Sequence, residues 1–342
     1  MEIAVAGAPA HTRTLDVEIA QAAPGRAVAR GTILDLRKRG LVPMASDLQT
    51  AGVIHDMRVD AELEQDPPRI ATLRARQPSV AFEPSHATDG ECCRDPAPRI
   101  EALAGTPLDA DATRRLGDAF GGPLGCSHVL TLAQLLIATA RRALALDARH
   151  AADARPEGQR IFHRSLSIDG IADGERLQLA FQLADVHCTA AVPGTQSDPL
   201  ERLRGRLEIR AQAEIELRSM KLLGLRCAER AGDGDAFYGE WRDRGDAVAD
   251  LAGRGAFGGL APLLFERLGD DDADRPLLDT LLNLSPALIQ CMPAVMERWH
   301  RSDGGDRPAM MAGGGMADSC YMWRRDGALL GRFEATEPKP VG

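Results

Sequence analysis

Lysine is scarce in this sequence and long apolar runs are missing. Lys38, Lys221 and Lys339 are the only lysines among 41 basic residues, and 50 acidic residues bring the net charge to −9. Nucleic acids are bound by clustered positive charge, so they are not an expected partner. No run of about 18 apolar residues occurs, and residues 1–5 lack a basic leader, which predicts a cytoplasmic protein with no membrane partner.

Regular cysteine spacing is lacking too. The seven cysteines include no Cys-x-x-Cys pair, and an odd number without a framework predicts thiols that are buried, metal-bound or reactive. A chain of 342 residues is long enough for two hydrophobic cores.

The sequence contains a weak internal repeat at an offset of about 150 residues. Five segments match in order: 13–17 with 164–168, 34–36 with 184–186, 42–43 with 192–193, 57–60 with 205–208, and 103–105 with 251–253. Asp35 and Asp185 coincide in this alignment, which indicates a shared turn or strand-end role and not catalysis. The collinear order predicts a tandem duplication.

Within each unit the hydrophobic pattern predicts strands first and helices afterwards. Strand-like runs fall at 12–19, 27–36, 53–63, 69–76, 162–168, 176–186, 204–216 and 219–228, and helical runs at 108–119, 128–146, 239–252, 258–268 and 276–300. The expected fold class is α+β, with two tandem related units, each a small antiparallel sheet covered by helices on one face. We expect a first unit at 1–147, a linker at 148–158, a diverged second unit at 159–301, and a glycine-rich segment with a C-terminal tail at 302–342.

Polar residues gather where strands and a helix are expected to end at one edge of the first unit. His55 and Asp56 open its third strand, and Cys126 and His128 enter its last helix, a pair that the second unit lacks. These four residues are the predicted catalytic group. His11, Arg13 and Cys93 are expected nearby, and the tail residues Cys320 and Trp323 either close the site or pack on the core.

Three chemistries fit this group. His55, Cys93, Cys126 and His128 can ligate zinc or iron. Cys126 can act as a thiolate nucleophile, with His128 or His55 as base and Asp56 orienting it. His55 and Asp56 can instead form an acid–base pair, with Cys126 lining the pocket. A purely structural Cys126 and His128 is the remaining alternative.

Two family resemblances follow from these motifs. The order His11-x-Arg13, Ile54-His55-Asp56-Met57 and Gly125-Cys126-Ser127-His128 resembles a bacterial family known as domain of unknown function 2889, over about residues 10–145. This resemblance implies no activity. The layout is also similar to the NifU and SufE scaffold superfamily of iron–sulfur assembly, where strands precede helices and three thiols meet. The matching positions would be His55 with Asp56, Cys92 or Cys93, and Cys126.

The leading functional hypothesis is an enzyme of small-molecule metabolism, a lyase or hydrolase acting on an aromatic or carboxylic acid. The rival is a non-enzymatic metal- or sulfur-handling module, and a third is a structural partner-binding protein. The sequence indicates no cofactor beyond zinc or iron and no oligomeric state.

Overall fold

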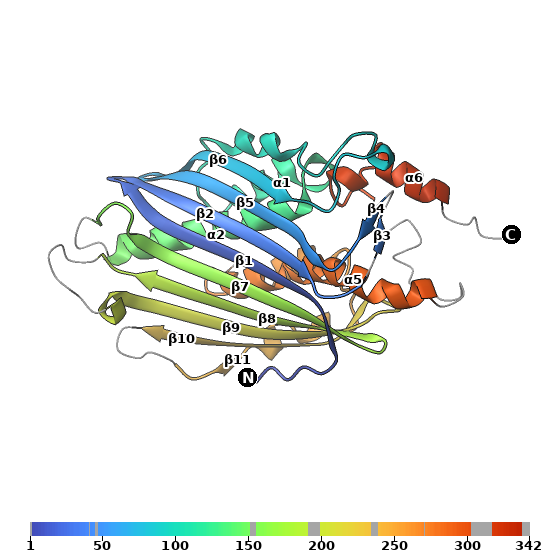
Figure 1. Cartoon of the computed structure of the whole chain (residues 1–342). Coiled ribbons are helices and arrows are strands. Elements are labelled where there is room, and N and C mark those ends of the chain that lie inside the picture. The colour runs from blue at the N-terminus through green and yellow to red at the C-terminus, as the bar shows by residue number, and fades with distance from the viewer. Residues whose placement is uncertain are drawn as a thin grey trace.

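The long strands of the chain all join one antiparallel sheet (Figure 1). The computed structural model describes residues 2–40, 42–44, 47–150, 155–190, 199–233, 239–269, 271–301 and 317–336. Within these residues the sheet has nine strands in the order β11-β10-β9-β8-β7-β1-β2-β5-β6. The expected glycine-rich segment from Asp303 to Gly315 lies outside the described residues.

Two blocks of four strands make up this sheet. The first block contains β1 (Ala8–Ala23), β2 (Arg26–Arg37), β5 (Gly52–Gln65) and β6 (Pro68–Ser79). The second block contains β7 (Arg160–Asp173), β8 (Arg176–Cys188), β9 (Leu203–Glu216) and β10 (Lys221–Asp233), with the short β11 (Arg242–Asp243) at its edge. A separate hairpin, β3 (Val42–Met44) and β4 (Asp47–Gln49), was not expected from the sequence.

The expectation of a separate sheet in each unit was wrong. β1 pairs with β7 along nearly its whole length, with Leu15 opposite Leu166, so the two blocks share one continuous sheet. The physical reason is that a long strand at the edge of a sheet leaves a row of unpaired backbone groups, and pairing the first strand of each block removes both edges.

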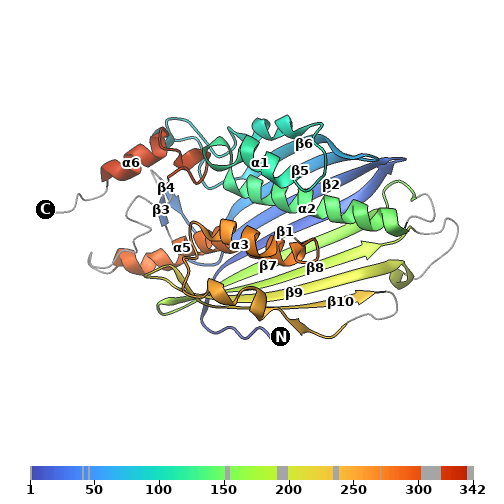
Figure 2. The same cartoon turned by 180° about the vertical axis from the view of Figure 1, so that it is seen from behind.

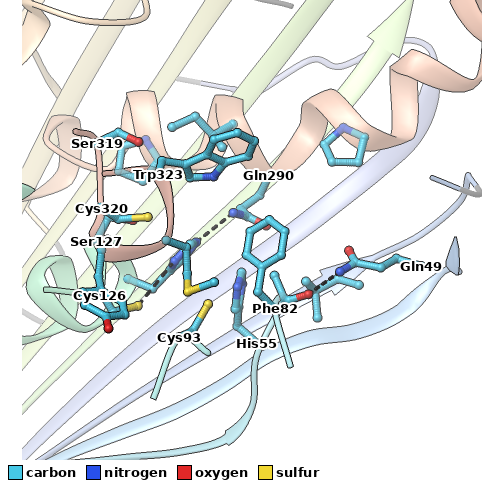
Figure 3. A pocket seen from close by; sticks show the side chains of 18 of the residues that line it. Gln49, His55, Phe82, Cys93, Cys126, Ser127, Gln290, Ser319, Cys320 and Trp323 are labelled. Atoms are coloured by element: carbon cyan, nitrogen blue, oxygen red, sulfur yellow. Dashed lines mark hydrogen bonds between the residues drawn. The ribbon is translucent and has the colours of Figure 1, made fainter. Parts of the chain in front are cut away.

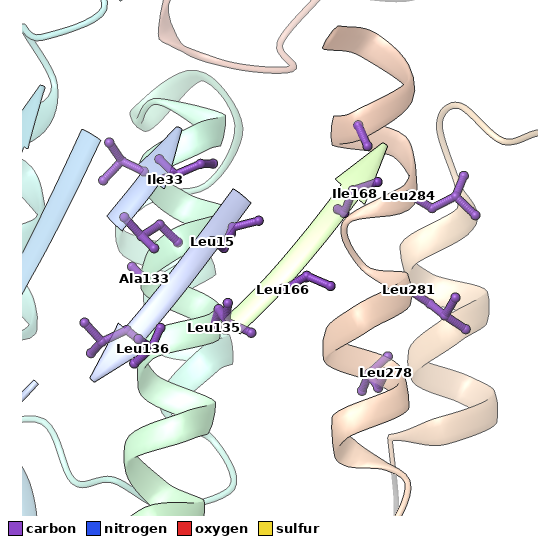
Figure 4. Packing of buried hydrophobic residues seen from close by; sticks show 14 of the residues in the cluster. Leu15, Ile33, Ala133, Leu135, Leu136, Leu166, Ile168, Leu278, Leu281 and Leu284 are labelled. Atoms are coloured by element: carbon purple, nitrogen blue, oxygen red, sulfur yellow. The ribbon is translucent and has the colours of Figure 1, made fainter. Parts of the chain in front are cut away.

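Six α-helices lie among the described residues, and all but the last cover one face of the sheet, whereas the last packs beside it on the 3₁₀ turns at 86–88 and 321–323 (Figure 2). They are α1 (Ala112–Phe120), α2 (Ser127–His150), α3 (Leu260–Leu268), α4 (Arg275–Leu281), α5 (Leu284–Arg301) and α6 (Ala328–Thr336). Leu15 and Ile33 of the first block lie beside α2, and Leu166 and Ile168 of the second block face the neighbouring helices (Figure 4). The fold class is therefore α+β, with one core running under both blocks.

Two helical predictions failed for local reasons. The run at 239–252 contains β11 and two short 3₁₀ turns, where the Asp243 carboxylate accepts a 2.7 Å hydrogen bond from the Gly245 amide and favours a turn. The run at 276–300 is split into α4 and α5. Pro286 cannot donate to the carbonyl of Leu282 and its ring clashes there, so the first helix ends before this point.

Helix α2 is apolar as well as long. Among the described residues, 127–149 is the one helical stretch that could cross a membrane by length and composition. Of its apolar 18-residue part, 67% is buried inside the protein. Such burial is typical of a core helix packed on a sheet.

The two blocks use the same backbone device after their fourth strand. The Gly105 amide donates to the Ile70 carbonyl and the Gly253 amide to the Leu222 carbonyl, each at 2.7 Å. Both glycines have a φ near +80°, which side chains disfavour. The third strands of the two blocks, β5 and β9, correspond in a different register from the sequence alignment of 57–60 with 205–208. Asp35 pairs with His55 and Asp185 pairs with Leu207, so His55 and Leu207 hold equivalent positions.

Candidate functional site

A single transverse row of the first block brings three charged residues together. On β1, β2 and β5 every second side chain points toward the helices, and Arg13, Asp35 and His55 all lie at such positions. Asp35 pairs with Arg13 on one side and with His55 on the other. The side chains of these three neighbours are almost fully buried. Strand alternation and register therefore build a polar cluster under the helices.

Asp35 is the centre of this cluster. Its Oδ1 accepts from Arg13 Nε at 2.9 Å, and its Oδ2 accepts from Arg13 Nη2 at 3.0 Å. His55 Nδ1 lies 2.9 Å from Oδ2. Burial alone would raise the pKa of Asp35, but the charge of Arg13 and the hydrogen bond from His55 hold it well below its usual range. The carboxylate is therefore ionised, and His55 must donate from Nδ1, which leaves Nε2 for a ligand.

Two further histidines flank this centre. His11 Nε2 lies 3.4 Å from Asp35 Oδ1, and His128 Nε2 lies 3.9 Å from Oδ2. The rings of His55 and His128 are 3.9 Å apart with a tilt of 34°. Burial lowers the pKa of His11 to about 4, although Asp35 opposes the shift. Burial, His55 and Arg13 also hold the pKa of His128 well below its usual value, so both rings are neutral near pH 7.

The start of α2 brings Cys126 and His128 to the cluster. A side chain at Gly125 would place its Cβ 2.2 Å from the Phe120 carbonyl oxygen, so only glycine permits this close turn. Cys126 Sγ lies 4.0 Å from His128 Nδ1. Burial raises the pKa of Cys126 to about 12, so its thiol is protonated near neutral pH. This protonation gives no support to a free thiolate nucleophile.

A cavity of about 150 Å³ opens above the cluster (Figure 3). His55, Cys93, Cys126 and His128 line it together with Cys320 and Trp323 of the C-terminal segment. That segment includes a 3₁₀ turn at Tyr321–Trp323, and the Tyr321 amide donates to the Gly125 carbonyl at 2.9 Å. The tail residues therefore contribute walls of the pocket. Burial raises the pKa of Cys93 and Cys320, so these thiols are protonated as well.

The second block contributes one polar side chain. Gln290 of α5 places its amide nitrogen 2.7 Å from His128 Nε2, and the amide can donate only when that ring nitrogen carries no proton. The approach of α5 depends on Gly170 of β7, where a Cβ would lie 2.1 Å from Cys291 Sγ.

Asp56 and Cys92 do not join the group. Asp56 follows His55 on the same strand and therefore points to the opposite face of the sheet, where its carboxylate lies 3.7 Å from Arg58. Cys92 instead lies 3.1 Å from an Asp95 carboxylate oxygen and does not line the pocket. Asp35 provides the carboxylate that Asp56 was expected to provide.

Asp35, His55 and His128 could hold a metal ion. One donor atom from each residue lies within 4.8 Å of the others. Both oxygens of Asp35 already accept hydrogen bonds from Arg13, and the nearby nitrogen of His55 is the one that donates to Asp35. A metal bound at His55 Nδ1 would have to displace that histidine hydrogen bond, whereas His55 Nε2 remains available as a ligand.

Asp35, Arg37 and Gln290 are the site residues that the sequence analysis missed. The signal for the first two was present, because Ala27, Ala29, Gly31 and Ile33 set an inward-facing alternation on β2 that continues to Asp35 and Arg37. An acid and a base in such a series predict a buried polar site. Nothing in the sequence signals Gln290, which comes from a helix of the other block.

Comparisons with known proteins give one result. No curated protein and no solved structure matches the chain, so the likeness to the NifU and SufE scaffold superfamily has no support. Residues 11–142, which contain most of β1, all of β2 to β6 and most of α2, match the family described as protein of unknown function, DUF2889.

Proposed function

We propose that the pocket is the active site of an enzyme that acts on a small organic molecule, and that His55 transfers the proton. The observation that carries the proposal is the buried pair of Asp35 and His55 beneath a largely apolar cavity. A carboxylate that fixes one imidazole nitrogen sets the tautomer and stabilises the imidazolium formed during proton transfer. Such a pair suits a lyase or hydrolase.

The surroundings of His55 support this role. The neutral His128 stacks beside His55, and its Nε2 accepts from Gln290, so its Nδ1 can donate a hydrogen bond without adding charge. The protonated thiols of Cys93 and Cys126, with Phe82 and Trp323, make largely apolar walls, and a substrate that fills the pocket would displace water from them. Exclusion of water strengthens the electrostatic interactions of the few polar groups inside.

Substitution of His55 tests the proposal. The full chain is incubated with a mixture of small organic acids and esters, and consumption is followed by mass spectrometry. We expect His55→Gln to lower the rate about 10²–10⁴-fold, the usual contribution of a positioned acid–base group. His163→Gln is the matched control, because His163 is also held by a carboxylate, Asp16 at 2.7 Å, but alternates with the buried Arg164 on β7 and therefore lies on the open face. Equal rates for both variants would reject the proposal.

A metal- or sulfur-handling module is the second candidate. It is favoured by the Asp35, His55 and His128 donor set and by three thiols, of Cys93, Cys126 and Cys320, in the same pocket. Soft sulfur with imidazole suits zinc or iron. Elemental analysis of protein purified without oxygen or chelators tests it: stoichiometric metal that is lost in both Cys126→Ala and His128→Ala supports this candidate, and metal-free protein with full activity rejects it.

We also propose that the two blocks arose by duplication and that the second has kept a structural role. The equivalent strand order, the paired glycines 105 and 253, and the Arg13–Asp35 and Arg164–Asp185 pairs support a common origin. The unit boundaries at 147 and 159 belong to the same proposal.

A further inference from the structure

Arg37 is a buried guanidinium, and no side chain that the structure describes gives it a negative partner. It extends from β2 toward the helices, is 2% exposed, and lines the pocket. Its hydrogen bonds are long, 3.5 Å to the Gln49 carbonyl oxygen and 3.4 Å to the Gln49 side-chain oxygen, and its Nε has no partner. Among the described residues no carboxylate forms an ion pair with it. Burial accordingly lowers the pKa of Arg37.

The other deeply buried arginines show what is missing. Arg13 holds Asp35 with two hydrogen bonds of 2.9 and 3.0 Å, and Arg164 holds Asp185 with two of 2.7 Å. A buried cation without a counter-charge is costly, whereas the planar guanidinium fork matches both oxygens of a carboxylate. Arg37 alone of these three lacks that match, and it faces the cavity.

Polar and apolar residues follow one another from one end of the pocket to the other. Gln49 marks one end, Cys126 marks the other, and His55 and Phe82 lie between them (Figure 3). Arg37 is at the Gln49 end, because both of its hydrogen bonds go to Gln49. Phe82 meets Trp323 edge to face, with ring centres 6.0 Å apart. An acid bound to Arg37 would place its apolar part against these rings.

We propose that Arg37 binds the carboxylate of a small apolar or aromatic carboxylic acid, whose body extends past His55 into the aromatic wall. The inference rests on the proposed function, since it names the substrate class of the same site. A single planar fork in a cavity of about 150 Å³ fits a compact carboxylate better than a phosphate, which needs more donors.

Binding measurements on the full chain test the assignment without any turnover. Acetate, isobutyrate and benzoate are titrated by calorimetry, each beside its neutral amide, and inorganic phosphate is used as a competitor. We expect at least one carboxylate to bind about tenfold or more tightly than its amide, as charge-assisted hydrogen bonds exceed neutral ones. Arg37→Gln should abolish this preference. Arg30→Gln, an exposed position on the same strand, should leave it unchanged.

Two further readouts separate the possible failures. Arg37→Gln should keep or raise the thermal midpoint of the ligand-free protein, because it removes an uncompensated buried charge, whereas a structural arginine would lower it. His55→Gln should retain carboxylate binding. If no carboxylate binds, if amides bind equally, if Arg37→Gln binds as wild type, or if phosphate displaces the acid at lower concentration, the inference is overturned. Loss of turnover in His55→Gln would then still uphold the proposed function.

Discussion

The centres of the two blocks are built on equivalent pairs of strands, β1 with β2 and β7 with β8, but have opposite charge arrangements. In the first block a carboxylate, Asp35, is shared by Arg13 and the imidazoles of His11 and His55. In the second block a guanidinium, Arg164, is shared by two carboxylates: it donates to Asp185 twice at 2.7 Å and to Asp279 at 2.6 Å.

This difference separates a reactive cluster from a structural one. His55 occupies the position that Leu207 holds in the second block, so at this position only the first block carries an imidazole with an exchangeable proton. Burial alone would lower the pKa of Arg164, but its two carboxylates raise it above the ordinary value. Permanent ion pairs stabilise a fold, whereas proton transfer needs a group that titrates.

Removing the central arginine of each block should have the largest effect and should distinguish the two. Arg164→Met leaves Asp185 and Asp279 buried without their shared cation, and we expect a loss of about 3–5 kcal/mol in the free energy of unfolding. Arg13→Met should cost less, because His11 or His55 can take up a proton beside Asp35. Urea denaturation measures both, with the half-exposed Arg26→Met as a control. A larger loss at Arg13 would contradict the comparison.

The contact between α5 and the centre of the sheet should have the next largest effect. Gly170→Ala places a methyl group against Cys291 Sγ, and overpacking of this kind costs about 1–3 kcal/mol. Because α5 carries Gln290, the change should also weaken its contact with His128, visible as a shift of the His128 ring resonances.

Two controls accompany this substitution. Gly224→Ala meets no atom within 4 Å and should be near neutral in stability. The double variant Gly170→Ala with Cys291→Ala should recover the stability and the contact of Gln290 with His128. With the sulfur removed, the new Cβ at position 170 lies 3.5 Å from the Cβ at position 291, an ordinary packing distance. If the double variant is no more stable than Gly170→Ala, the steric explanation does not hold.

The smallest expected effect is a pH dependence produced by the buried histidines of the first block. His11 has a pKa of about 4 when folded and about 6.5 when unfolded, so between these values the unfolded chain binds the proton that the folded chain rejects. The stability contributed by a neutral His11 is therefore fully present above about pH 6.5 and is lost as the pH falls toward 4. His128 acts in the same direction.

Phenylalanine provides the matched variant, because Phe162 occupies the position in the second block that corresponds to His11. Chemical denaturation at several pH values between 4 and 7 gives the free energy of unfolding, and this energy should depend less steeply on pH in His11→Phe than in wild type. An unchanged slope would show that this ring does not titrate as its burial implies.

The local parts of this structure could be predicted from the sequence. The alternation of apolar and polar residues predicted the eight long strands, and α2 begins just after Cys126 as expected. His55, Cys93, Cys126 and His128 line one pocket, as do Cys320 and Trp323. Whether these residues carry out catalysis stays a prediction.

The remaining errors concern distant pairing and side-chain direction. The pairing of β1 with β7 joins strands about 150 residues apart, and alternation within a strand does not identify its neighbour. Asp56 was chosen for being next to His55 in sequence, although adjacent residues of a strand point to opposite faces. Asp35 was assigned a structural role because it matched Asp185, but identical residues in the two blocks have different neighbours.

The pairing of β1 with β7 has a practical consequence for anyone who isolates the family-matching region. A fragment ending near residue 142 would keep the pocket floor but expose the edge of β1 that pairs with β7, from Ala8 to Ala20. A long, bare edge recruits any available strand, including the same edge of another copy. Such a fragment should self-associate through its backbone, and its assembly would reflect the cut and not the biology of the intact chain.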